Sequence, residues 1–190
     1  MGKGSVVRTL LRLVPDLVLS VSCTTRDPRP GEVDGRDYRF VSNRDFDRLI
    51  EDGAFLEWAE IYGHRSGTLW GPVVADLEQG RDVVLEIDVQ GAETVRRRLP
   101  AAVLIFLSPP SPQELERRLR ARRSEGEGQV SRRLAAATQE MEAAEWFDHE
   151  VVNDDLDRAA AEVAAIIGSV RSSAPPAGFE HPDTQGERSP

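Results

Sequence analysis

The stretch from Ser20 to Phe40, SVSCTTRDPRPGEVDGRDYRF, carries the residues best suited to hold an anion. Small hydroxyl residues come first, and Arg26 and Arg29 follow in a loop stiffened by prolines. Proline fixes φ, and Gly31 and the pair Asp34-Gly35 favour tight turns, so the loop has few conformations to lose on binding. Two arginines held in this way near hydroxyl donors suit a phosphate group.

Another interpretation of the same stretch is a solvated basic turn in a hairpin, because arginines are common on protein surfaces. The stretch alone leaves both interpretations open. A second glycine-bounded loop, GHRSGT at residues 63–68, adds Arg65, Ser66 and Thr68 as possible phosphate contacts.

Three carboxylates are candidates for a second kind of contact. Glu57 lies among apolar neighbours, and is either a half-buried strand residue that faces water or a buried acceptor for a ligand. The run DVVLEID at 82–88 reads as a buried parallel strand, so Glu86 and Asp88 would share one face at its carboxyl end. Ligands of open α/β sheets bind at that edge. The alternative is that these carboxylates only mark a solvated strand end, which is a reasonable explanation for one of them but less so for the pair.

The chain opens with Gly2-Lys3-Gly4-Ser5, followed by apolar residues at helical spacing up to Pro15. A glycine-rich turn with lysine at the start of a helix is similar to the second half of a P-loop, where backbone N–H groups and the lysine hold phosphates. The full pattern needs a strand and an earlier glycine upstream, so these residues alone are weak evidence.

Arginines gather again around the stretch SEGEGQ at 124–129, which is polar, glycine-rich and predicted to be a mobile loop. A helix that begins near Ser111 leads into Arg122, and helix resumes near Ser131, just before Arg133. The arginines are either a solvated helix face paired with glutamates or part of a lid that brings cations over reacting phosphates.

Composition limits the classes of function. The chain has 190 residues, a net charge of −9, one cysteine (Cys23) and three widely spaced histidines. These values argue against a general nucleic-acid binder, an internal disulfide and a structural zinc site. No apolar run approaches the roughly 20 residues that cross a bilayer, and no signal peptide is evident, so we expect a soluble, cytoplasmic protein without a membrane partner.

Strands that alternate with helices predict an α/β domain with a parallel sheet. The turn-rich stretch 20–70 is better explained as an inserted β lobe, and residues from Arg171 onward should form a disordered tail.

In this order and spacing, the motifs SVSCTTRDPRPGEVDGRDYRF, FLEWAE, LEIDVQG and VVNDD resemble those of guanylate kinases over residues 2–170. The resemblance implies a P-loop NTPase-type α/β fold, with a parallel sheet flanked by helices. It places the core at 1–19, 76–121 and 136–170, a small β-rich GMP-binding lobe at 20–75, a helical lid at 122–135 and the tail at 171–190. The implied reaction is transfer of a phosphoryl group from ATP to GMP, giving ADP and GDP, with Mg²⁺ and within purine nucleotide metabolism.

The resemblance also assigns roles to residues of this chain. The GMP phosphate contacts fall on Arg26, Arg29 and Tyr38. The guanine contacts fall on Ser22, Glu57, Thr68 and Asp88, with Glu86 beside them. The catalytic cations would be Lys3 and the lid arginines, Arg122 and Arg133. ATP contacts fall on Gly2, Lys3, Gly4, Ser5 and Asn153, and Ser5 is the only candidate for a direct contact with the metal.

Two departures from the family pattern leave an alternative open. Ser66 stands where the family usually has tyrosine, so one phosphate contact is lost, moved or water-mediated, and Arg65 is the candidate to compensate. The family's first strand and the front of its P-loop are not in this sequence, and the neighbours of that central strand would lose a ladder partner. We expect a guanylate kinase whose true start lies upstream. The alternative is a non-catalytic guanylate-kinase-like module that binds GMP or a protein.

Overall fold

The computed structural model describes residues 2–61, 63–121, 141 and 143–173 of the chain. The described residues form two compact units. The first consists of residues 2–15 and the described part of 103–174, and the second consists of the described part of 16–102. The predicted lid and tail, with Arg122 and Arg133, lie almost wholly outside the described residues.

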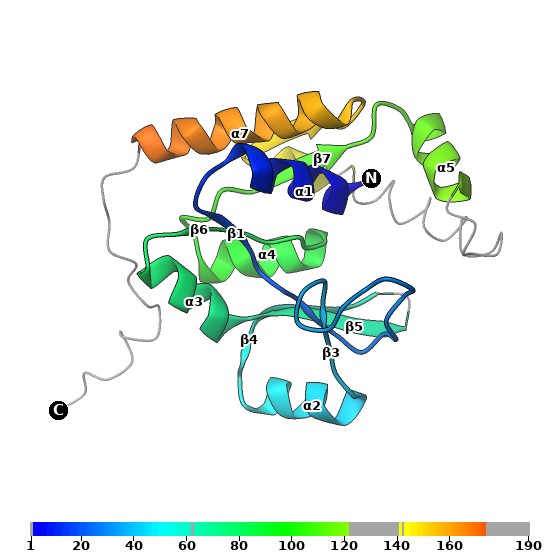
Figure 1. Cartoon of the computed structure of the whole chain (residues 1–190), viewed down its shortest axis with the longest axis vertical. Helices are drawn as coiled ribbons and strands as arrows, with labels where there is room; N and C mark the ends of the chain where they lie inside the picture. Colours follow the sequence, from blue (N-terminus) through cyan, green and yellow to red (C-terminus); the bar gives the residue numbers. More distant parts are fainter. Residues whose placement is uncertain (1, 62, 122–140, 142, 174–190) are drawn as a thin grey trace. The chain divides into compact units, whose positions relative to one another are not determined.

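The first unit contains a two-stranded parallel sheet, in which β7 (Ile105–Ser108) pairs with β8 (His149–Val152). Helices α1 (Lys3–Leu13) and α7 (Leu156–Ser173) lie side by side (Figure 1). Their buried residues fall at helical spacing: Val6, Val7 and Leu10 in α1, and Ala159, Ala160 and Val163 in α7. The same unit contains α5 (Pro112–Ala121) and a 3-10 turn at Ala143–Trp146.

Helix starts in both units follow the capping chemistry that the sequence indicates. Ser42 Oγ accepts a hydrogen bond from Asp45 N (3.1 Å) at the start of α2 (Asn43–Glu51). Ser111 Oγ accepts from Glu114 N (3.1 Å) before α5, and Asp155 Oδ1 accepts from Arg158 N (2.9 Å) before α7. Each bond satisfies one of the free N–H groups in the first turn of its helix. The helix start predicted near Ser111 is confirmed.

The second unit contains two sheets. β1 (Leu17–Leu19) pairs in parallel with β6 (Asp82–Val84). A four-stranded sheet has the order β3 (Arg39–Phe40), β2 (Cys23–Thr24), β5 (His64–Leu69) and β4 (Phe55–Ile61). β2 and β3 run parallel, so the arginine loop between them is not the hairpin considered from the sequence. The unit also contains helices α2, α3 (Trp70–Glu78) and α4 (Val89–Arg98).

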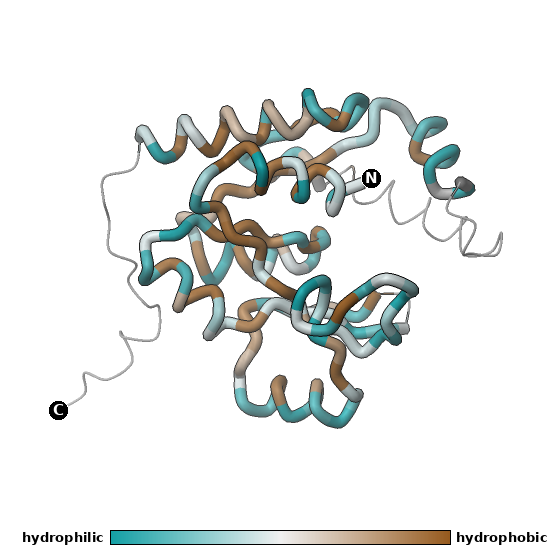
Figure 2. The backbone as a smooth tube through the Cα atoms, viewed as in Figure 1, coloured by the Kyte–Doolittle hydropathy of each residue, from teal (hydrophilic) through white to brown (hydrophobic). Residues whose placement is uncertain are grey.

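An apolar cluster fixes α2 against the four-stranded sheet. Cys23, Phe46, Phe55 and Leu69 form it, and all four are buried. The rings of Phe46 in α2 and Phe55 in β4 stack with centroids 4.5 Å apart. Figure 2 shows α2 with alternating apolar and polar stretches, as expected for a helix with one face on a sheet. Burial raises the pKa of the Cys23 thiol, which fits its packing role.

A β-bulge in β4 decides which way Glu57 points. Phe55 pairs with Leu69 and Glu57 pairs with Thr68, so Leu56 is an extra residue without a partner. Side chains two residues apart in a regular strand share a face, whereas one inserted residue sends the later side chain to the other face. Phe55 therefore packs on Phe46 of α2, while Glu57 reaches α4 on the opposite side.

The strand predicted at 82–88 is shorter in the structure. β6 ends at Val84, and residues 85–88 are irregular, so Glu86 and Asp88 do not share a strand face. Instead Asp88 caps α4, which requires a non-helical backbone at that residue. Among the described strands, β6 pairs only with β1 and β7 only with β8. None of the described helices is both long and apolar enough to cross a membrane.

Candidate active site

The two carboxylates most suited to read a base meet at the N-terminus of α4, within the second unit. Glu57 is only 5% exposed, and its strand partner Thr68 is 1% exposed. Asp88 Oδ1 accepts a hydrogen bond from Gly91 N (2.8 Å). A Cβ built on Gly91 would lie 2.6 Å from Glu57 Oε2. Both acidic groups therefore lie against the same residue of α4.

Burial makes Glu57 a weaker acid than an ordinary glutamate. Removal from water raises the pKa of its carboxyl group, and the charge of Asp88 raises it further. The hydroxyl and backbone of Thr68 partly offset this rise. The Thr68 hydroxyl lies close enough to Glu57 to have this effect, but Thr68 Oγ1 is buried and has no hydrogen bond of good geometry to a described residue. A buried carboxylate beside such a hydroxyl offers both an acceptor and a donor for hydrogen bonds.

The arginine loop is held in one conformation by hydrogen bonds to Glu32, called here the Glu32 clamp. Glu32 accepts two hydrogen bonds from Arg26, from Nη1 (2.7 Å) and Nη2 (2.8 Å), and a third from Arg29 N (2.7 Å). The bonds to Arg26 lower the pKa of Glu32 and raise that of Arg26, so both stay charged. Arg26 also donates to Asp27 O. These bonds use the two Nη atoms of the guanidinium.

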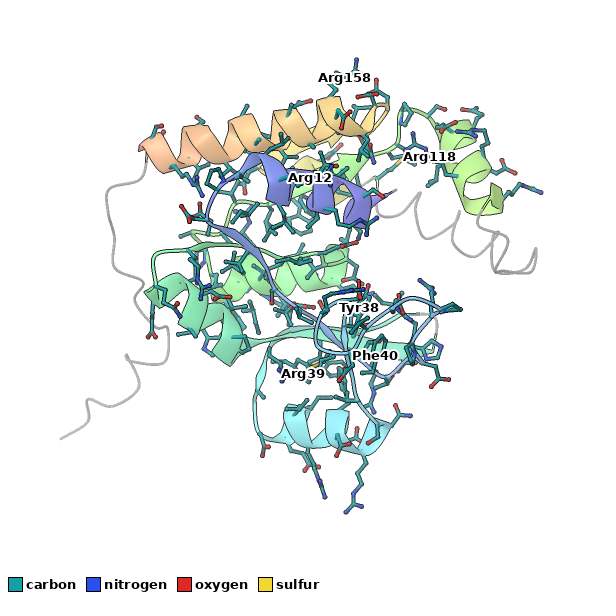
Figure 3. The ribbon with its side chains drawn as sticks, viewed as in Figure 1. Arg12, Tyr38, Arg39, Phe40, Arg118 and Arg158 are labelled. Atoms are coloured by element: carbon teal, nitrogen blue, oxygen red, sulfur yellow. The ribbon has the colours of Figure 1, made fainter. Side chains whose placement is uncertain are left out.

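Aromatic rings cover the Arg26 guanidinium. Its Cζ lies 4.9 Å from the centre of the Tyr38 ring and 5.6 Å from that of Phe40. Figure 3 shows Tyr38 and Phe40 together beside the loop. Stacking and the clamp fix the guanidinium plane, so its charge is presented in one orientation to an oxygen anion. Gly35 adopts φ 75°, and its N–H donates to Tyr38 O (2.8 Å), which turns the loop back at the predicted place.

Arg65, the candidate to compensate for Ser66, contacts helix α2. Arg65 pairs with Asp47, donates to Asn43 O (2.9 Å) and lies over the Phe46 ring, all in α2. These contacts commit the guanidinium to the α2 side of the sheet. Ser66 Oγ instead donates to Thr24 Oγ1 (3.0 Å), in the strand just before the arginine loop.

The first unit brings together several of the residues predicted to contact ATP. Gly2 precedes α1, and its carbonyl accepts hydrogen bonds from Ser5 N and Val6 N. A Cβ at Gly2 would lie 3.2 Å from Asn153 Nδ2. Gly2 thus caps α1, Lys3, Gly4 and Ser5 form its first turn, and Asn153 lies beside the cap. Asn153 N donates to Ser108 O (2.8 Å), which joins the ends of β8 and β7.

Sequence reasoning missed four residues that support these sites. Arg118 Nη1 in α5 donates to Asn153 O (2.9 Å), and Figure 3 shows this side chain at α5. Glu32 forms the Arg26 clamp, Gly91 contacts the Glu57 carboxylate, and Arg98 bonds to β4. Glu32 could have been found from the sequence, because it is the only acid between Arg29 and the turn at Asp34-Gly35. The other three needed α4 and α5 to be placed against strands distant in sequence.

The comparisons with known proteins agree with this architecture. The family model described as guanylate kinase matches residues 1–170. A guanylate kinase of Rhodococcus jostii is 51% identical over 168 residues, covering 87% of this chain and 81% of that protein. One of Rubrobacter xylanophilus is 50% identical over 175 residues, covering 92% of each.

A solved structure supports the same assignment. The crystal structure of guanylate kinase from Anaplasma phagocytophilum aligns with a TM-score of 0.75 and 33% identity, covering 88% of this chain and 81% of that one. Its fold agrees with the parallel strands and flanking helices described above, and with a P-loop NTPase-type α/β architecture. The chain belongs to the guanylate kinase family of ATP:GMP phosphotransferases.

Proposed function

We propose that this chain transfers the γ-phosphoryl group of ATP to GMP, and that its second unit selects GMP by the guanine base. The observation that carries the proposal is the buried Glu57 carboxylate, which lies with Asp88 against the start of α4. A buried carboxylate is costly unless hydrogen-bond donors reach it, and a ligand can bring them.

Guanine supplies those donors. Its N1–H and 2-amino group point the same way from one edge of the base, so one carboxylate accepts both bonds. Adenine carries an acceptor in place of N1–H, which would leave Glu57 unpaired. An unpaired buried polar group is how such sites reject a wrong substrate by several orders of magnitude. Thr68 Oγ1 and Asp88 would add further contacts. Ser22 would contribute from beside Cys23, which pairs with Gly67, and Glu86 from two residues before Asp88.

The phosphate of GMP would be held by Arg26, Arg29 and Tyr38. The clamp by Glu32 supports this role, because it fixes the Arg26 plane before any ligand arrives. Arg29 is exposed, and its backbone is tied to the same clamp. A rigid cation loses little entropy on binding, so the phosphate gains more from each hydrogen bond.

The phosphates of ATP would bind at the first turn of α1, on the N–H groups of residues 3 and 4 and the Lys3 ammonium, with Asn153 and Arg118 near the rest of the nucleotide. Ser5 offers one hydroxyl to a magnesium ion that comes with ATP. Among the described residues, no group of three or more His, Cys, Asp or Glu could hold a metal ion. Mg²⁺ usually keeps phosphate and water ligands, and it would neutralise charge on the phosphates.

In phosphoryl transfer the protein mainly positions the two nucleotides and neutralises the charge of the phosphates. The GMP side would hold the acceptor oxygen in place through the phosphate contacts and the base. Lys3 would hold the donor phosphates, and Arg122 and Arg133, in the proposed lid at 122–135, would supply further positive charge. A lobe at 20–75 and a core made of the remaining segments, followed by a tail from 171, complete the proposed organisation.

An enzyme is favoured over a non-catalytic GMP-binding module, because this chain covers 81% and 92% of two curated guanylate kinases. The substrates, ATP and GMP, are metabolites of the cytoplasm, where we propose that the protein acts. No nucleic-acid or membrane partner is proposed.

A product assay tests the proposed reaction. With ATP, Mg²⁺ and GMP, we expect chromatography to show GDP and ADP formed in equal amounts, with kcat/KM for GMP at least about 10³-fold above that for AMP. Formation of ADP without GDP, or equal use of AMP, would contradict the proposal.

A further inference from the structure

Helix α4 touches β4 at two separated points, and the first is Gly91. Gly91 is buried in the first turn of α4, and an added Cβ would lie 2.6 Å from Glu57 Oε2 and 3.2 Å from Glu57 Cδ. Real Cβ atoms essentially never approach an oxygen this closely, so the carboxylate occupies the space that a side chain at residue 91 would need.

The second point lies at the other end of the helix. Arg98 Nη1 donates to Phe55 O (2.6 Å) and to Leu56 O (3.0 Å), and its guanidinium lies over the Trp70 ring at 5.2 Å. Phe55 and Leu56 are the two residues of the β4 bulge that precede Glu57. The bulge directs Glu57 toward α4, and Arg98 ties the carbonyls of the bulge to the same helix.

We propose that Gly91 is a positioning residue for base selection: the absence of a side chain there lets the Glu57 carboxylate lie beside Asp88 in the place where it meets guanine. This inference rests on the proposed role of Glu57 and assigns to α4 the task of fixing that acid.

The local chemistry explains why glycine is needed. Glycine within a helix is destabilising relative to alanine, so helix formation alone gives no reason for it. Its backbone N–H already bonds to Asp88 Oδ1 (2.8 Å), so residue 91 holds one acid through its N–H and makes room for the other at its Cα. A methyl group at this position would push Glu57 away from Asp88. Small displacements of a positioning group can lower turnover about 10²-fold.

The test compares Gly91→Ala with Gly71→Ala. Gly71 lies in α3, and a Cβ there would have no heavy atom within 4 Å, so it reports the effect of a glycine-to-alanine change without the contact. We expect Gly91→Ala to lower kcat/KM for GMP by about 10- to 100-fold and to change that for AMP by about twofold or less, so that base selectivity falls. Gly71→Ala should keep wild-type values for both substrates. Equal losses with GMP and AMP, or unchanged selectivity, would overturn the proposal.

Thermal unfolding keeps the proposal testable if Gly91→Ala impairs folding. The variant should lower the melting temperature in the wild-type background. Most of this loss should disappear in a Glu57→Ala background, which removes the 2.6 Å contact and leaves Ile87 Cβ, at 3.2 Å from the added methyl. An equal loss in both backgrounds would show that the carboxylate is not what the methyl group meets.

Kinetic comparison of Glu57→Gln with Gly91→Ala distinguishes failure of this inference from failure of the proposed function. If Glu57→Gln keeps full preference for GMP, Glu57 does not read the base and the proposed function fails at that residue. If Glu57→Gln loses the preference but Gly91→Ala keeps it, only the role of Gly91 fails. In the Glu57→Gln background, Gly91→Ala should cause little further loss, because both changes act on the same contact.

Discussion

Glu57→Gln is expected to lower kcat/KM for GMP by about 10²–10³-fold and to change that for AMP little. A carboxylate accepts two hydrogen bonds from guanine, each worth about 1.5–3 kcal/mol when the acceptor is charged. The amide keeps one acceptor and turns its NH₂ group toward a donor. A loss of about 3–4 kcal/mol corresponds to the stated factor. Steady-state kinetics with both nucleotides measure it.

Glu60→Gln is the matched control, since Glu60 lies on the same strand and is exposed. It should leave both substrates unaffected. A Glu57→Gln variant that loses activity equally with GMP and AMP would show damage to the fold rather than to base selection. The free variant should melt no lower than wild type, because a neutral amide is less costly to bury than a charged carboxylate.

The same variant should remove a pH dependence. Because burial and Asp88 raise the pKa of Glu57, its carboxylate becomes protonated at a higher pH than an ordinary glutamate as the pH falls. As the pH falls, the KM for GMP should therefore begin to rise at a pH above the one at which an ordinary glutamate becomes protonated. The phosphate of GMP itself titrates near pH 6, so the Glu57→Gln profile, which keeps that phosphate, is the reference. Identical profiles for the two proteins would contradict a role for ionised Glu57.

Arg26→Lys should raise the KM for GMP and for AMP together, by about 30- to 100-fold. Lysine keeps the charge but loses both the paired bonds to Glu32 and the stacking on Tyr38, so the cation is no longer held in a plane. Each charge-assisted bond to the phosphate contributes about 1.5–3 kcal/mol. Both nucleotides carry the same phosphate, so the ratio of their kcat/KM values should stay constant.

Arg36→Lys is the control for Arg26→Lys. Arg36 lies in the same loop, is exposed and bonds to neighbouring groups of the loop, Asp37 and Gly31 O. It should behave as wild type with either nucleotide. A large effect of Arg36→Lys would mean that the loop responds to any arginine change, and a changed base preference in Arg26→Lys would mean that Arg26 does not act on the phosphate alone.

The sequence indicated local features well, because their chemistry is local. The helix start near Ser111 is confirmed, as is the turn at Gly35. In each case a short side chain bonds to an amide three residues ahead, or a glycine supplies a positive φ, and neither depends on distant parts of the chain.

The sequence could not indicate how the acids meet. An inserted residue at Leu56 reverses the face on which Glu57 lies, and the apolar pattern around it gave no sign of a bulge. Helix α4 was not predicted, so Asp88 was placed on a strand instead of at the start of that helix. Arg65 was assigned to a phosphate, but distant acceptors in α2 hold it. Each outcome depends on contacts between segments far apart in sequence, which periodicity does not report.

The central claim is that a buried carboxylate at residue 57 selects the base by accepting two N–H bonds, and binding of three nucleotides tests it most directly. Calorimetric titration of the wild-type chain with GMP, IMP and AMP changes only the edge of the base that faces Glu57. IMP keeps N1–H and lacks the 2-amino group, and AMP lacks both donors. We expect affinity to fall by about tenfold or more from GMP to IMP, as one charge-assisted bond is lost, and to fall again from IMP to AMP. Equal affinities for the three nucleotides would show that the Glu57 carboxylate does not read the base.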